Sequence, residues 1–104
     1  MVYLANAFSL NMLSGLPCYL KVARLSVEQV KEMLPGARSV VGHVQSAALF
    51  SAVLGEEIQC RRDTVTLLVG DRVVVGQYRG PRLPEGAMEL PPGATIEWNV
   101  VEIC

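Results

Sequence analysis

The segment from Ser39 to Gly55 constrains the fold of this chain more than any other. Residues 39–41 form a short segment that is mostly apolar and β-prone, and a Gly42-His43 corner follows it. The next residues carry large apolar side chains at helical spacing, so we expect an amphipathic helix that ends at the glycine. A strand that turns directly into a helix is typical of α/β proteins, which often bind ligands at that edge of the sheet.

His43 is the only histidine in the chain, and it stands where the expected helix begins. The first backbone N–H groups of a helix have no partner within it and attract anions. Gln45 and Ser46 lie in the first turn, close to the histidine. Two interpretations follow: an imidazole placed for phosphate chemistry, or a partly buried corner residue with one hydrogen bond. Taken alone, this stretch favours the second.

Length and charge limit the possible functions. The chain has 104 residues, enough for one domain (1–104) with one modest core. Its formal net charge is −1, which argues against a general binder of duplex nucleic acid because such proteins present a basic face. A small anionic ligand held by a few arginines remains compatible with this charge.

The cysteines indicate a reducing compartment. Cys18, Cys60 and Cys104 are odd in number and far apart, so neither a disulfide framework nor a zinc site is expected. We therefore predict no metal, no cofactor and a cytoplasmic location. We expect neither a signal peptide nor a membrane partner, because no basic region precedes an apolar stretch and no apolar run could span a bilayer.

The remaining periodicity predicts an α/β domain with one mixed sheet of about five or six strands and flanking helices. Ser26 is a good N-cap for a helix that runs to about Leu34. The Gly70-Asp71 pair predicts a tight hairpin turn between strands at 64–69 and 72–78. Trp98 alternates with polar residues in the last strand and is expected in the core or at a dimer contact. Further strands are expected at 1–5, 19–25, 39–41 and 95–103.

Two irregular segments are candidate binding loops. In the first, at 6–15, Asn6, Ser9 and Asn11 favour turns and either face a ligand or belong to an ordinary loop pinned by apolar neighbours. The second, at 79–86, contains two prolines and two glycines and is therefore stiff. It is either an exposed turn with solvated charges or a phosphate clamp in which Arg82 donates two hydrogen bonds.

Three motifs in order resemble those of a known family. They are residues 3–13 (YLANAFSLNML), 41–43 (VGH) and 82–86 (RLPEG). The sequence resembles the anti-CRISPR ring nucleases of archaeal viruses and their relatives in bacteria and mobile elements, over nearly the whole chain. This resemblance implies a small α/β homodimer with a pocket at its interface for cyclic tetra-adenylate, the second messenger of type III CRISPR defence. It also implies metal-independent cleavage of that ring to linear di-adenylates.

The resemblance also implies roles for individual residues. His43 and Glu85 match the family's catalytic histidine and glutamate, and Arg82 and Arg62 match its phosphate-binding arginines. Further substrate contacts fall on Asn6, Ser9 and Gln77.

The sequence departs from the family pattern at two places. Val44 and Gln45 stand where viral members often carry an aspartate and a serine. The loop before Arg82 is one residue longer, so Arg79 becomes a further candidate for phosphate contact beside Gln77.

The chemistry is consistent with a single histidine per chain. A 2′-hydroxyl can attack its neighbouring phosphate once aligned, provided that charge is stabilised and the leaving 5′-oxygen is protonated. Histidine is suited to be that acid near neutral pH. A ring of four nucleotides cut into halves needs two equivalent sites, which a two-fold dimer supplies. Two alternatives stay open: a non-catalytic sponge or sensor for the same messenger, and a structural or interaction protein of a mobile element.

Overall fold

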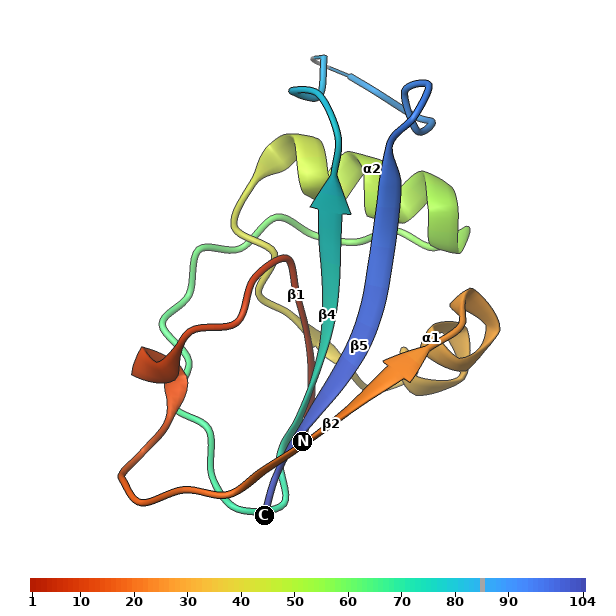
Figure 1. Cartoon of the computed structure of the whole chain (residues 1–104). Coiled ribbons are helices and arrows are strands. Elements are labelled where there is room, and N and C mark those ends of the chain that lie inside the picture. The colour runs from red at the N-terminus through yellow and green to blue at the C-terminus, as the bar shows by residue number, and fades with distance from the viewer. Residues whose placement is uncertain (85) are drawn as a thin grey trace.

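The fold is built on a five-stranded mixed sheet in the order β2-β5-β4-β1-β3 (Figure 1). The computed structural model describes residues 1–84 and 86–104. Strand β1 pairs in parallel with β3 and β4, whereas β5 runs antiparallel to β4 and β2. The predicted α/β class is therefore confirmed. The elements are β1 (Val2–Ala5), a 3-10 helix (Leu10–Met12), β2 (Leu20–Leu25), α1 (Val27–Met33), β3 (Arg38–Ser39), α2 (Val44–Leu54), β4 (Arg72–Arg79) and β5 (Thr95–Ile103).

Both α-helices begin and end as the sequence predicts. The Ser26 hydroxyl accepts a hydrogen bond from the Gln29 N–H at 3.2 Å, and the Gln29 side chain accepts one from the Ser26 N–H at 2.8 Å. This reciprocal pair is a capping box. Helix α2 ends at Gly55, whose φ of 71° is the left-handed conformation that glycine adopts without strain.

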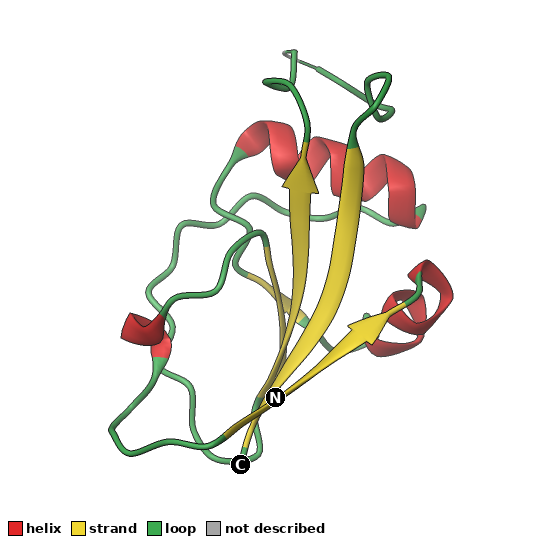
Figure 2. Ribbon diagram, viewed as in Figure 1, coloured by secondary structure: helices red, strands yellow, loops and turns green. Residues whose placement is uncertain are grey.

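The two helices pack on the same face of the sheet (Figure 2). At the centre of this face the rings of Phe50 and Trp98 lie with their centroids 4.9 Å apart, and both residues are almost fully buried. Of the two positions expected for Trp98, the core and a dimer contact, the structure shows the core. The other buried residues of this cluster are Leu4, Val30, Leu34, Val41, Ala47, Leu54 and Val74.

Loops and the short 3-10 helix, rather than α-helices, cover the opposite face (Figure 2). Val65 and Leu67 are buried there, and the Leu67 N–H donates to the Met12 carbonyl at 2.7 Å. The predicted strand at 64–69 and its hairpin with 72–78 are wrong. Each strand has two edges, and those of β4 are already occupied by β1 and β5. The β-prone segment therefore lies across the sheet and buries its apolar side chains there.

Strand β3 is shorter than predicted, and a second segment runs beside its end. The predicted strand at 39–41 is reduced to Arg38–Ser39, and Val41 forms an isolated parallel bridge with Cys60. The Arg61 N–H donates to the Val41 carbonyl at 2.8 Å. We call residues 59–62 the strap, because they tie the chain between β3 and α2 to the segment that follows α2. None of the helices among the described residues is long and apolar enough to cross a membrane.

Candidate functional site

The N-terminus of α2 lies close to the loop that joins β4 to β5. Figure 1 shows α2 crossing β4 and β5 near the ends from which this loop projects beyond the sheet. His43 is the N-cap of α2, with an extended backbone and no side-chain hydrogen bond to the helix. The imidazole is exposed. The partial positive charge of the helix N-terminus is therefore available to an anion beside it.

Two tight contacts at its base shape the β4–β5 loop. The Tyr78 hydroxyl donates to the Pro81 carbonyl at 2.6 Å. Gly80 packs so closely on Ala94 that a Cβ at this glycine would lie 2.6 Å from the alanine Cβ. The stiffness that the sequence indicates is thus reinforced by packing, and the backbone ahead of Arg82 is fixed.

Between the helix and this loop lies a cavity of about 360 Å³. Four of the sequence-predicted site residues line it together, because the loop lies next to the first turn of α2. The wall is completed by four residues that were not among the predicted site residues, Tyr78, Gly80, Pro81 and Leu83. Their position in or beside the stiff loop was the only signal that could have found them. The predicted residues lining it are His43, Gln45, Ser46 and Arg82.

Asn6 and Arg62 lie beside the cavity instead of lining it. The Asn6 Oδ1 accepts a hydrogen bond from the Gly42 N–H at 3.2 Å, and the Arg62 Nε donates to the Gly42 carbonyl at 2.8 Å. Both side chains therefore contact the backbone immediately before His43. Their expected contact with substrate stays a prediction.

Four other predicted residues lie away from this cavity. The Ser9 hydroxyl caps the 3-10 helix by accepting from the Asn11 N–H at 3.2 Å. Gln77 and Arg79 alternate along β4 with Tyr78, so they project from the opposite face of the sheet. There the Arg79 Nε lies 3.5 Å from a carboxylate oxygen of Glu97. The structure does not gather these residues around His43, and their binding roles stay predictions.

Glu85, the second predicted catalytic residue, lies outside the described residues. The described lining of the cavity carries the imidazole of His43, the guanidinium of Arg82 and no carboxylate. Together with the helix N-terminus, this lining favours an anionic ligand such as a phosphate. Within the described ranges, 1–84 and 86–104, no group of three His, Cys, Asp or Glu side chains could hold a metal ion.

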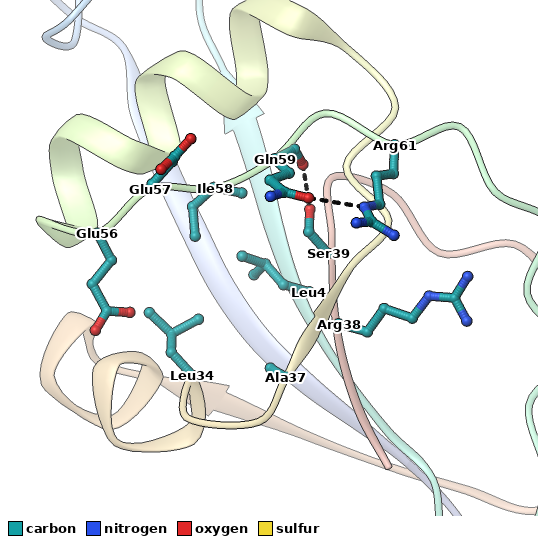
Figure 3. Close-up of a pocket in the computed structure, with 10 residues that line it drawn as sticks. All are labelled: Leu4, Leu34, Ala37, Arg38, Ser39, Glu56, Glu57, Ile58, Gln59 and Arg61. Atoms are coloured by element: carbon teal, nitrogen blue, oxygen red, sulfur yellow. Dashed lines mark hydrogen bonds between the residues drawn. The ribbon is translucent and has the colours of Figure 1, made fainter.

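A second cavity, of about 430 Å³, lies beside β3 (Figure 3). Its two arginines are engaged within the protein: Arg38 bonds Asp63 at 2.9 Å, and the Arg61 Nε donates to the Gln59 side chain at 3.0 Å. Glu56 and Glu57 add negative charge to its wall. This balance of charges makes it a weaker site for an anion than the cavity beside His43.

Comparison with known proteins identifies the family. The chain is similar in structure to B116 of Sulfolobus turreted icosahedral virus, with a TM-score of 0.82 and 26% sequence identity over 97% of each chain. No curated protein matched the sequence. The model of the STIV B116-like family matches residues 2–92. The chain therefore belongs to the STIV B116-like family.

Proposed function

We propose that the protein is a metal-independent ring nuclease that cleaves cyclic tetra-adenylate to linear di-adenylates. The observation that carries the proposal is the cavity in which His43, Arg82 and the first turn of α2 meet. It combines a group suited to proton transfer with two sources of positive charge. The resemblance to viral ring nucleases supports the same conclusion, and B116, the similar solved structure, is a viral protein.

The proposed reaction uses the RNA's own 2′-hydroxyl as the nucleophile. Its oxygen attacks the adjacent phosphorus, and the bond from phosphorus to the 5′-oxygen breaks. The leaving oxygen takes a proton from His43, while the attacking hydroxyl loses its own proton to water. Each cut therefore leaves one end with a 5′-hydroxyl and one with a 2′,3′-cyclic phosphate. Arg82 and the N–H groups at the start of α2 stabilise the negative charge that develops on the phosphate.

The size of the cavity supports a dimeric enzyme. At about 360 Å³ it is near the lower end of the range of roughly 300–1,000 Å³ for small-molecule sites, so it suits part of a tetranucleotide ring. Two copies across a two-fold axis would hold the whole ring and bring two imidazoles to opposite phosphates. This requirement is the reason for proposing a homodimer.

The function is tested by incubating the protein with labelled cyclic tetra-adenylate in the presence of chelator. We expect linear di-adenylates from the natural protein and intact ring with His43→Ala, because the acid is missing. Activity that disappears in chelator and returns with a divalent ion would contradict the metal-independent mechanism.

The same samples separate catalysis from binding. Tight binding of the ring without cleavage by the natural protein would identify a sponge or sensor. Neither binding nor cleavage would leave the interaction-protein alternative. Linear tetra-adenylate serves as the control ligand, because it carries the same bases and phosphates without the closed ring.

A further inference from the structure

The backbone on both sides of the Gly42 Cα is held by side chains from distant parts of the chain. Asn6, which directly follows β1, accepts from the Gly42 N–H at 3.2 Å. Arg62, in the strap, donates through Nε to the Gly42 carbonyl at 2.8 Å. That carbonyl belongs to the peptide group joining Gly42 to His43. Two side chains, 36 and 20 residues away in sequence, therefore fix the approach to the imidazole.

The His43 backbone determines the point from which the imidazole projects. The imidazole is exposed and, among the described residues, makes no side-chain hydrogen bond that would orient it. The His43 carbonyl accepts the first bond of α2, from the Ala47 N–H at 2.9 Å. The helix thus restrains the residue on its C-terminal side. On the other side the nearest restraints are the two contacts at Gly42, and the bond from the Arg61 N–H to the Val41 carbonyl lies one residue further away.

We propose that Asn6 and Arg62 are positioning residues, which clamp Gly42 and thereby hold the His43 imidazole at the cavity. This inference rests on the proposed function, because it assigns the purpose of the clamp to proton transfer at that cavity. It differs from the substrate contacts expected for these two residues, since each acts here through Gly42. A misplacement of about 1 Å in a catalytic group can reduce the rate by about 10²-fold.

The strap offers a matched control for Arg62. Arg61 and Arg62 are adjacent, and both side chains are exposed. Arg61 is directed to the second cavity and bonds Gln59 there (Figure 3), whereas Arg62 bonds Gly42. Replacing either one by alanine removes the same charge from the same short segment. Only the change at position 62 removes a contact with the clamped backbone.

The first experiment follows the ring resonances of His43 by NMR in the protein without ligand. Because the chain has a single histidine, these resonances need no assignment against others. We expect Arg62→Ala and Asn6→Ala to shift and broaden them, and Arg61→Ala to leave them in place. Asn6→Asp keeps an oxygen acceptor for the Gly42 N–H, so its ring resonances should stay as sharp as those of the natural protein, although the added charge shifts their position.

The second experiment measures single-turnover cleavage of cyclic tetra-adenylate by Asn6→Ala. The rate constant should fall by about 10- to 100-fold while the dissociation constant of the ring is unchanged, because the variant keeps its charge and loses only the placement of the acid. A ligand role for Asn6 would weaken binding instead.

Specific outcomes overturn the clamp. The proposal is contradicted if the ring resonances stay in place in both Asn6→Ala and Arg62→Ala. It is also contradicted if Arg61→Ala shifts them as much as Arg62→Ala does. An Asn6→Asp protein whose resonances match those of Asn6→Ala would also contradict it. If the natural protein does not cleave the ring, the proposed function fails, while the NMR comparison still decides whether the two residues position His43.

Discussion

Gly76 provides the sharpest test of how the helix face of the sheet is packed. It lies in β4 directly opposite Trp98 of β5. A Cβ built on this glycine would lie 2.5 Å from Trp98 Cζ3, 2.9 Å from Trp98 Cη2 and 2.7 Å from Phe50 Cζ. Favourable carbon contacts lie at about 3.5–4.0 Å, so Gly76→Ala forces both rings to retreat by about 1 Å.

The loss of folding free energy caused by this displacement of the rings can be bounded. Both rings are almost fully buried, with 4% of Trp98 and none of Phe50 exposed, so no open space receives them. Overpacking of this kind typically destabilises by about 1–3 kcal/mol. For a domain of about 100 residues each kcal/mol lowers Tm by roughly 4–8 °C. We therefore expect the Tm of Gly76→Ala to fall by roughly 4–24 °C.

The assay is urea and thermal unfolding followed by the fluorescence of Trp98, the only tryptophan. Gly15→Ala is the matched control, because nothing lies within 4 Å of a Cβ at Gly15 and its φ is not positive. The Gly15→Ala protein should be as stable as the natural protein, or more stable by about 0.4–1 kcal/mol, because alanine reduces the flexibility of the unfolded chain. A Gly76→Ala protein as stable as Gly15→Ala would refute the packing described for Phe50 and Trp98.

Four further predictions concern the cavity beside His43 and the dimer that it requires. His43→Ala should lose about 10²–10⁴-fold in cleavage rate while its affinity for cyclic tetra-adenylate, measured by calorimetry, stays nearly unchanged. Arg82→Ala should weaken that affinity by roughly ten- to a hundredfold, since a hydrogen bond to a charged group contributes about 1.5–3 kcal/mol. Arg24→Ala is the control and should leave the affinity unchanged, because Arg24 lies in β2 and does not line the cavity. Tyr78→Phe removes the 2.6 Å bond to Pro81 and should slow cleavage with little change in Tm; unchanged turnover would show that this bond does not shape the loop. Light scattering should give the mass of a dimer, and a fully active monomer would contradict the two-fold site.

Local signals in the sequence predict much of this fold. Ser26 and Gly55 mark helix ends because capping and the left-handed conformation are properties of one or two residues. The alternation of Ile96 and Trp98 with polar residues predicts the bounds of β5, Thr95–Ile103. Its burial is less regular than this alternation, because Val101 and Ile103 are buried on the opposite face from Trp98. Local signals do not show which strands pair, because paired strands can be far apart in the sequence. The β-prone segment at 64–69 therefore predicts a hairpin that does not form, since β1 and β5 already occupy both edges of β4.

The residues of the candidate site also differ in whether local sequence signals could predict them. His43 and Arg82 could be singled out from residue type and loop stiffness, and the structure places both at one cavity. Tyr78 could not, because its role depends on a hydroxyl that reaches the Pro81 carbonyl after the strand has ended. The contacts of Asn6 and Arg62 with Gly42 join segments that only the folded sheet brings together.

The most direct test of the central claim is the chemistry of the product ends. The protein is incubated with cyclic tetra-adenylate in chelator and ¹⁸O-labelled water, and the products are examined by mass spectrometry. Attack by the 2′-hydroxyl predicts linear fragments with a 5′-hydroxyl and a 2′,3′-cyclic phosphate, without ¹⁸O in the first product formed. Fragments that carry ¹⁸O on a 5′-phosphate beside a free 3′-hydroxyl would show attack by water and contradict the proposed mechanism.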